Sequence, residues 1–387
     1  MDSCENNDLV VFSHLRWNFV FQRPQHLMSR FAKKRRVFYF EEPIFEDVSF
    51  PRIHTHQSEE GVFVVTPFLP QAFLKLNYQA VLATLLDELL MARYIHNFNI
   101  WYFTPMALTF SRHLSPKRIV FDIIDELVHF ADAPPLLKEL ENELLMKADL
   151  VFTAGHSLFE AKKNRHHNIH AFPSSVDKIH FAQARLKPTD PMDQIKISRP
   201  RVGYFGAIDD RVDMVLLAEM ARLRPDIQFI LIGPIVKANP ETLPQADNIH
   251  YLGQKSYREL PNYIAHWDCA MIPFVLNDST QYINPTKTLE FLAAGKPVVS
   301  TAIMDVIYPY GENNLVHVAE SATQFIDYIE LALLERRNIK WQLQVDSLLA
   351  EVSWDNTWQK MTALELLPTT SIESPNTEFF YQMNSTL

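Results

Sequence analysis

Short apolar runs alternate with longer amphipathic segments along most of this 387-residue chain. The short runs are rich in β-branched and aromatic residues, which is typical of buried strands, and the longer segments have the period of helices. Strands that are apolar throughout and separated by helices indicate a parallel sheet buried on both faces. The alternation therefore predicts an α/β fold.

The alternation occurs in two series. In the first, we expect strands at 9–13, 37–41, 62–67, 100–103, 119–123, 150–154 and 169–172, and helices at 25–33, 74–97, 135–147 and 157–163, with Ser157 as the cap of the last. In the second, we expect strands at 201–205, 228–232, 249–252, 269–272 and 297–301, and helices at 214–222, 257–265 and 286–294. Two units of similar size indicate two α/β domains.

The segment between the two series, 182–200, is polar, contains three prolines and lacks a period, which is typical of a linker. We expect an N-terminal domain over 1–185 and a C-terminal domain over 195–350. A closing segment over 351–368 contains a helix at 354–366, capped by Ser353 or Asp355. Residues 369–387 are rich in Ser, Thr and Asn, and we expect a flexible tail.

Composition limits the binding partners and the cellular compartment that we expect for this chain. The formal net charge of -10 opposes binding to nucleic acid or to anionic lipid. The only cysteines are Cys4 and Cys269, so a disulfide framework is not expected and a reducing cytoplasm fits. The acidic N-terminus does not resemble a secretory signal, and we find no apolar stretch of about 18 residues to span a bilayer.

Glycine is scarce, which makes its positions informative. Six of the 8 glycines fall in the second half, and Gly206, Gly233 and Gly253 each follow an expected strand. Glycine permits a positive φ and close approach of the backbone to a ligand, and ligands of open α/β sheets lie beyond the carboxyl ends of strands. Three such glycines favour a phosphate-binding edge over ordinary turns.

The segment 284–300 carries the strongest chemical signal. Pro285 is a good first helical residue, and Thr286 and Lys287 then lie in the first turn, where free N–H groups attract an anion. Glu290 lies one turn further along the same face. A cation near a diphosphate with a carboxylate one turn away suits phosphate and ribose hydroxyls. A surface Lys–Glu pair on a capped helix is the alternative from spacing alone.

The whole segment resembles the donor-binding helix of GT-B-fold glycosyltransferases of family 4. In that family a Glu-x7-Glu motif precedes an Ala-x-Gly-x-Pro-Val-Val strand, and its second Glu holds the nucleotide ribose. Glu290 fits the second Glu, and residues 293–299 read Ala-Ala-Gly-Lys-Pro-Val-Val. Tyr282 stands in place of the first Glu. This variant resembles a subgroup of cell-surface polysaccharide transferases.

The resemblance extends over about residues 9–366. Residues 202–207 resemble the first strand and loop of the family's C-domain, and 231–234 resemble the exit of its second strand. Residues 248–254 resemble the strand whose following loop cradles the base, which makes Gln254 a donor-binding candidate. Arg211 and Lys287 are our substitutes for the family's Arg and Lys diphosphate clamp. The resemblance implies two Rossmann-like, doubly wound domains facing a cleft, with a C-terminal helix that returns to the N-domain.

Two segments of the N-terminal half offer groups for an acceptor. The loop after the first strand contains His14, Trp17, Gln22 and Arg23, and aromatic and polar groups together suit a sugar ring. Plain packing is the alternative for Trp17.

An acidic triplet ends the strand at 119–123. Asp122, Asp125 and Glu126 lie there, where carboxylates could accept bonds from acceptor hydroxyls, although a helix cap is an equally good interpretation. We take Asp122, Asp125 and His14 as catalytic candidates. Trp17, Gln22, Arg23 and Glu126 are the acceptor-binding candidates.

The activity that the resemblance implies is transfer of a sugar from a nucleoside-diphosphate sugar to a hydroxyl of a sugar or glycolipid acceptor. It implies retention of configuration, no metal or other cofactor, and a role in surface polysaccharide or glycolipid synthesis. Contact with the inner face of the membrane is conceivable at 33–36 and 71–76. The alternatives are a nucleotide-sugar epimerase and a non-catalytic sugar- or nucleotide-binding module; a Rossmann oxidoreductase is disfavoured because no G-x-G-x-x-G follows the first strand.

Overall fold

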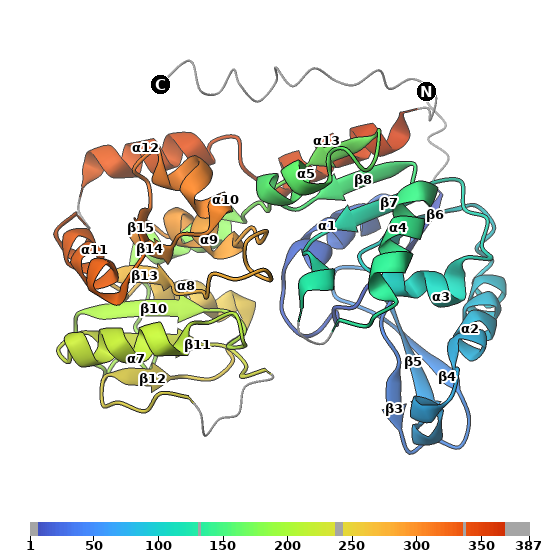
Figure 1. The fold of residues 1–387 in the computed structure, drawn as a ribbon, viewed down its shortest axis with the longest axis horizontal. Coiled ribbons are helices and arrows are strands. Elements are labelled where there is room, and N and C mark those ends of the chain that lie inside the picture. Colours follow the sequence, from blue (N-terminus) through green and yellow to red (C-terminus); the bar gives the residue numbers. More distant parts are fainter. Residues whose placement is uncertain (1–6, 131–132, 237–242, 336–337, 368–387) are drawn as a thin grey trace.

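The computed structural model describes residues 7–130, 133–236, 243–335 and 338–367. The cysteine expected in the N-terminus, Cys4, and the tail expected over 369–387 lie outside these residues. The described chain forms two α/β halves side by side, each built around its own sheet (Figure 1).

The N-terminal half contains nine strands within the described residues, in the order β3-β5-β2-β1-β6-β7-β8-β9, with β4 antiparallel to β5 and every other pairing parallel. The strands are β1 (Asp8–Phe12), β2 (Val37–Phe40), β3 (Ile44–Glu46), β4 (Arg52–Gln57), β5 (Phe63–Pro70), β6 (Phe98–Tyr102), β7 (Ile119–Ile123), β8 (Leu150–Thr153) and β9 (Ile169–Ala171). Along β1, Val10 and Phe12 belong to one apolar cluster and Leu9 and Val11 to another. The sheet is thus buried on both faces, as its apolar strands predict.

The C-terminal half contains six parallel strands in the described part of the chain, β10 (Arg201–Phe205), β11 (Gln228–Ile232), β12 (Ile249–Tyr251), β13 (Cys269–Ile272), β14 (Val298–Thr301) and β15 (His317–Ala319). Their order is β12-β11-β10-β13-β14-β15. This is the doubly wound order of a dinucleotide-binding sheet, in which the first three strands extend the sheet to one side and the fourth to sixth extend it to the other. The strand order therefore reverses between the first and the fourth strand. Here that point lies between β10 and β13.

Helices cover both sheets. They are α1 (Arg23–Ala32), α2 (Gln79–Ala92), α3 (Leu108–Ser111), α4 (Leu137–Lys147), α5 (His156–Lys162), α6 (Lys178–Ala182), α7 (Met214–Leu223), α8 (Leu260–Ile264), α9 (Thr286–Ala293), α10 (Met304–Val306), α11 (Ala322–Glu335), α12 (Ile339–Leu349) and α13 (Trp354–Leu366). Shorter helical turns are η1 (Gln71–Lys75), η2 (Pro105–Ala107), η3 (Leu127–His129), η4 (Gln183–Leu186), η6 (Tyr257–Glu259) and η7 (Ile307–Gly311). The helix expected over 74–97 is shorter than predicted, because η1 precedes it and it ends at Ala92.

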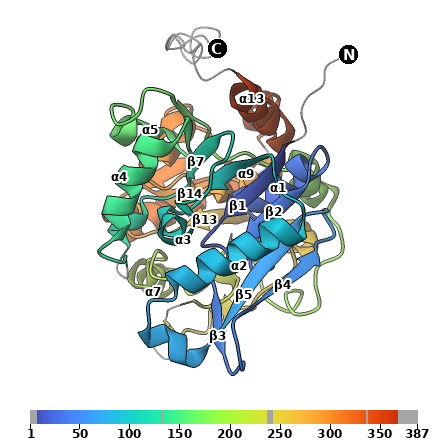
Figure 2. The same cartoon turned by 90° about the vertical axis from the view of Figure 1, so that its right-hand side faces the viewer.

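The last helix, α13, returns to the N-terminal half. Its Trp354 and Met361 pack in the same core cluster as β1, and Glu365 accepts hydrogen bonds from Arg35 and Asn99. Ser353 caps it, since its Oγ accepts from the backbone N–H of Asn356 at 3.1 Å. Figure 2, which looks at the N-terminal half, shows α2 in front of the sheet and α13 above it.

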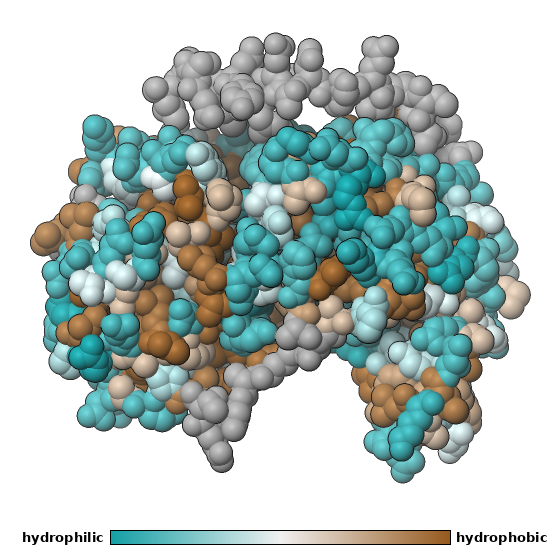
Figure 3. All heavy atoms as spheres, in the orientation of Figure 1, coloured by the Kyte–Doolittle hydropathy of each residue, from teal (hydrophilic) through white to brown (hydrophobic). Residues whose placement is uncertain are grey.

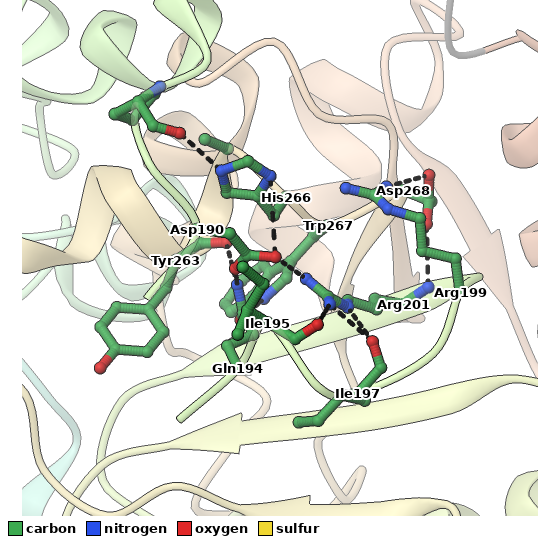
Figure 4. Close-up of polar contacts among 12 residues, drawn as sticks. Asp190, Gln194, Ile195, Ile197, Arg199, Arg201, Tyr263, His266, Trp267 and Asp268 are labelled. Carbon is green, nitrogen blue, oxygen red and sulfur yellow. Dashed lines mark hydrogen bonds and ion pairs between the residues drawn. The ribbon is translucent and has the colours of Figure 1, made fainter. Parts of the chain in front are cut away.

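The chain crosses between the halves earlier than expected. Val176, Phe181 and Ala184 are buried in the core cluster of the C-terminal half, although the N-terminal domain was expected to run to 185. The polar segment that follows is fixed to the C-terminal sheet (Figure 4): Asp190 accepts from Arg201 at 2.7 Å, and Gln194 accepts from the indole N–H of Trp267 at 2.9 Å. Polar side chains in this segment therefore serve to anchor it.

Candidate active site between the two halves

Three glycine-containing loops leave neighbouring strands of the C-terminal sheet at one edge. Gly206, Gly233 and Gly253 follow β10, β11 and β12 and all have positive φ. The loops approach one another so closely that a Cβ on Gly233 would lie 1.7 Å from the carbonyl oxygen of Gly206. Only glycine permits this approach, and Gly206 lies at the point where the strand order reverses, where ligands of such sheets bind.

The helix α9 begins beside the first of these loops. Lys287 Nζ lies 2.7 Å from Glu290 Oε2, 3.4 Å from Thr286 Oγ1 and 4.5 Å from the ring centroid of Phe205. The Lys287 side chain also passes within 3.5 Å of the position that a Cβ on Gly206 would take. Gly206 belongs to one motif of the sequence and Lys287 and Glu290 to another, and the structure brings the two motifs together. The helix starts at Thr286, as the expected range 286–294 has it, and Pro285 stands at its N-cap position and not as its first helical residue.

A cavity of about 530 Å³ lies over this edge, and residues of both halves line it. The C-terminal half contributes Phe205, Gly206, Ile232, Gly233, Pro234, 254–257, Leu260, Lys287 and Glu290, and the N-terminal half contributes 17–21 and 57–60. Gln254 Nε2 donates a hydrogen bond to the carbonyl oxygen of Phe19 at 3.1 Å and so joins the two walls. Pockets of this kind at the reversal point of an α/β sheet are the usual place for a ligand.

Several residues lining the cavity were missed by the sequence analysis. The turn between β4 and β5 contributes Glu59 and Glu60, and the loop after β12 contributes Lys255 and Tyr257. The turn carries no motif, and β4 is polar and half exposed, so no apolar pattern marked it as a strand. Lys255 and Tyr257 directly follow Gln254, and the resemblance that identified Gln254 was the signal that could have found them.

Aromatic rings pack across the junction beside the cavity. The Phe21 ring of the N-terminal half lies 5.2 Å from the Tyr257 ring of the C-terminal half. Next to Phe21, and within the N-terminal half, the His26 ring stacks on Trp354 of α13 at 4.6 Å. Burial lowers the pKa of His26 well below its ordinary value, and the nearby cations Arg30 and Lys287 lower it further. His26 is therefore neutral at pH 7, which suits an imidazole packed on an indole ring.

Two of the expected site residues form a buried ion pair instead. Asp122 is fully buried and accepts hydrogen bonds from Arg23 at 2.9 and 3.1 Å, and Arg23 also donates to the carbonyl oxygen of Phe172 at 2.7 Å. Neither lines the cavity. The pair gives Asp122 and Arg23 a structural role inside the N-terminal half, and their expected roles in catalysis and acceptor binding stay predictions.

Glu126 also has an internal role. It is buried and lies 2.7 Å from Lys162, which in turn pairs with Glu141 at 2.9 Å. Its carboxylate belongs to this ion-pair network, and its expected contact with an acceptor stays a prediction. Gln22 lies at the start of α1, where its N–H donates to Gln25 Oε1, and it does not line the cavity.

The remaining N-terminal candidates differ in position. Trp17 lines the cavity, but its ring is buried and packs edge-on against Tyr39 at 5.0 Å between the ring centroids, so it belongs to the core and to the cavity wall. His14 does not line the cavity; burial lowers its pKa to about 4, so it is neutral at pH 7. Its Nδ1 has no hydrogen-bond partner within the described residues.

Asp125 of the N-terminal half and Arg211 of the C-terminal half do not line the cavity, but their charges influence one another. Burial raises the pKa of Asp125 to about 6, while Arg211 lowers it and Asp209 raises it. Arg211 is itself held by Asp209, with Nη2 2.6 Å from Oδ2. Arg211 pairs with Asp209 and does not line the cavity, so its place in a diphosphate clamp stays a prediction.

Within the described residues, no group of three or more His, Cys, Asp and Glu side chains is arranged to hold a metal ion. In the same part of the chain, no helix combines the length and the apolar character needed to cross a bilayer.

Known proteins share the fold of this chain, and a known family matches part of its sequence. Residues 199–335, which contain the glycine loops, Lys287 and Glu290, match the family model described as glycosyl transferases group 1. The chain has the GT-B fold, and residues 199–335 are similar to glycosyl transferases of group 1. The predicted fold, including the two facing domains and the returning helix, is confirmed.

Among curated proteins, the chain is similar to "Putative teichuronic acid biosynthesis glycosyltransferase TuaH" of Bacillus subtilis (strain 168), with 25% identity over 241 residues. The match covers 58% of this chain and 60% of that protein, so it spans well under two thirds of the relative's length.

Solved structures share the fold at low identity. A trehalose-6-phosphate protein from E. coli bound with UDP-2-fluoro glucose has a TM-score of 0.68 at 14% identity, covering 94% of this chain and 100% of that one. Sucrose-phosphate synthase from Thermosynechococcus elongatus has a TM-score of 0.69 at 15% identity, covering 93% and 98%. Anabaena Alr3699/HepE in complex with UDP and glucose has a TM-score of 0.64 at 15% identity, covering 93% and 99%.

Proposed function

We propose that this protein is a glycosyltransferase that moves a sugar from a nucleoside-diphosphate sugar to an acceptor hydroxyl. The observation that carries the proposal is the cavity in which Lys287, Glu290 and the Gly206 loop converge at the reversal point of the C-terminal sheet. The group 1 glycosyl transferase match of residues 199–335 supports it. Two fold relatives are described with UDP-2-fluoro glucose or with UDP and glucose, which supports a nucleotide-sugar donor.

In this proposal the donor diphosphate lies between Gly206 and the first turn of α9. The N–H groups there and the Lys287 ammonium would stabilise the negative charge that gathers on the leaving diphosphate. Glu290 would accept bonds from the ribose hydroxyls, with Gln254 toward the base. Because these groups can take the diphosphate charge, we propose that the reaction needs no metal or other cofactor.

The acceptor would enter from the N-terminal half. The loop with Trp17 lines the cavity from that half and would contact the acceptor, and Asp125 is kept as the catalytic candidate. The name of the Bacillus subtilis relative supports a role in surface polysaccharide synthesis. Retention of configuration remains an implication of the family resemblance, and we carry it as part of the proposal.

Contact with a membrane would suit a glycolipid acceptor. Leu74 in the turn η1 and Leu76 directly after it are 61% and 59% exposed, on the lobe of β3, β4 and β5 that projects from the N-terminal half (Figure 1 and Figure 3). The other expected patch, 33–36, is less available, because Arg35 pairs with Glu365 and Arg36 with Asp8. We therefore propose that η1 and the residue after it face the membrane. The double variant Leu74→Ser/Leu76→Ser should sediment less with phospholipid vesicles than wild type. Unchanged sedimentation would refute this membrane contact.

The activity is tested with UDP-, GDP- and ADP-sugars and alkyl glycoside acceptors, by following nucleotide release and resolving products by NMR. We expect a new glycoside, with Lys287→Ala strongly impaired. Lys360→Ala, which removes an exposed lysine of α13 outside the cavity, is the matched control. An isomerised donor sugar would replace the proposal with an epimerase, and a protein that binds nucleotide without turnover would replace it with a binding module.

A further inference from the structure

A carboxylate of the C-terminal half caps a helix of the N-terminal half. Asp305, in α10, is only 2% exposed, and its two oxygens accept hydrogen bonds from the backbone N–H groups of His156 at 3.0 Å and Ser157 at 2.9 Å. These residues form the first turn of α5, which lies where the two halves meet (Figure 1). A helix N-terminus presents unsatisfied N–H groups and partial positive charge, so a carboxylate there stabilises it.

The helix has no cap of its own. The residue before its first turn is Gly155, which has no side chain, and the Oγ of Ser157 has no hydrogen-bond partner in the described part of the chain. The expectation that Ser157 caps this helix was therefore wrong, because the cap comes from Asp305, 148 residues later in the chain. The contact exists only while the two halves hold this arrangement.

The absence of a side chain at Gly155 makes room for the Asp305 carboxylate. A Cβ on Gly155 would lie 2.2 Å from Asp305 Oδ2 and 3.1 Å from Asn284 Cβ. The backbone of Gly155 is extended, with φ −159°, a conformation open to any residue. Glycine is thus required here by the approach of the other half and not by its own backbone.

Asn284 connects the contact to the donor helix. Its Nδ2 donates to Asp305 Oδ2 at 3.0 Å, and its Oδ1 accepts from the backbone N–H of Ser174 at 3.0 Å. Asn284 lies three residues before Lys287, at the entrance to α9. One buried carboxylate therefore joins α5, the segment that crosses between the halves, and the start of the helix that carries Lys287 and Glu290.

We propose that Asp305 is a positioning residue that fixes the N-terminal half against the donor helix α9. It does not line the cavity, so it would act through α5 and Asn284 and not on the substrate. Its consequence for turnover rests on the proposed glycosyltransferase function. Because turnover requires groups from both halves and nucleotide binding mainly those of the C-terminal half, loss of Asp305 should lower kcat far more than nucleotide affinity.

The test uses two variants that attack the contact from opposite sides. Asp305→Ala removes the cap, and Gly155→Ala places a methyl group where the carboxylate lies. Each should raise hydrogen exchange at the amides of His156 and Ser157 and lower kcat about 10- to 100-fold, since small misplacements of reacting groups cost this much. The Kd for UDP should change less than about threefold. A threefold change in Kd corresponds to about 0.65 kcal/mol of binding free energy, since a tenfold change corresponds to about 1.4 kcal/mol.

The double variant Asp305→Ala/Gly155→Ala should be no worse than either single change, because both remove the same contact. Asp305→Asn keeps one acceptor oxygen and should be intermediate in both readouts, which also covers the case in which Asp305→Ala does not fold. Asp327→Ala, an exposed residue of α11, is the matched control and should behave as wild type.

Unchanged exchange at His156 and Ser157, or unchanged kcat in both single variants, would overturn the proposal. A loss of UDP affinity as large as the loss of kcat would also overturn it, since Asp305 would then act on the nucleotide site itself. If the wild type neither binds UDP nor turns over while Asp305→Ala still raises exchange at these amides, the contact stands as described and the proposed function is what fails.

Discussion

The buried pair of Arg23 and Asp122 allows a sharp test of which charged residues serve the fold. Asp122 is fully buried and Arg23 is 3% exposed, and three of their contacts lie between 2.9 and 3.1 Å. Removing one partner leaves the other charge buried without compensation, which costs about 3–5 kcal/mol. Asp122→Ala should therefore lower the free energy of unfolding of the N-terminal half by about that amount.

The loss of stability should depend on whether the charge of the partner residue is removed as well. The Arg23→Met/Asp122→Leu double variant removes both charges and fills the space with apolar atoms, a replacement that is often close to neutral. The double variant should thus be more stable than Asp122→Ala. Urea unfolding followed by tryptophan fluorescence measures the stabilities, and calorimetry with UDP checks that the donor cavity is intact in each variant.

The reasoning would be refuted if Asp122→Ala unfolds at the same urea concentration as wild type. It would also be refuted if the double variant is less stable than Asp122→Ala, because the cost would then not come from an unpaired charge. A variant of wild-type stability that has lost turnover would return Asp122 to the catalytic role first expected for it.

Three further predictions concern other parts of the molecule. Gly233→Ala should destabilise the fold and abolish nucleotide-dependent thermal shift, because its Cβ would lie 1.7 Å from a backbone carbonyl oxygen; Gly253→Ala, with nothing within 4 Å, should cost only backbone strain, and equal effects would contradict this. Since burial raises the pKa of Asp125 to about 6, its folded-state pKa exceeds the unfolded one, and the stability it contributes is lost as pH rises from about 4 to 6. Wild type should lose stability relative to Asp125→Asn over that window in urea titrations, and a constant difference would contradict it. Lys162→Met should destabilise by about 3–5 kcal/mol by leaving Glu126 buried and unpaired, with the UDP Kd unchanged; a weakened Kd would place this network at the site.

Much of the fold follows from local pattern. The strands β10, β11 and β13 occur at the residues expected from their apolar runs, because a strand buried on both faces must be apolar throughout. The bounds of α13 also agree with the expectation, since Ser353 is a strong capping residue. By contrast, β4 is an edge strand with alternating exposure and polar residues, and sequence offers little to separate it from a loop.

The site was predictable where one segment supplies it. Lys287 and Glu290 lie on one helix face, and the glycines follow strands that a parallel sheet brings to one edge. Asp122 could not be assigned from sequence, because its partner Arg23 lies 99 residues away and only the folded sheet brings them together. The cap supplied by Asp305 was hidden for the same reason. Charged residues near a sheet edge look alike in sequence whether they face a ligand or each other.

The central claim, that the C-terminal half holds a nucleoside diphosphate through Glu290 and its neighbours, is tested most directly by calorimetric binding of UDP and GDP to wild type and Glu290→Ala. We expect at least one of the two to bind wild type, and the variant to bind about 10- to 150-fold more weakly, the value of about 1.5–3 kcal/mol for a hydrogen bond to a charged group. Binding of neither nucleotide to wild type, or equal affinity in the variant, would contradict the account.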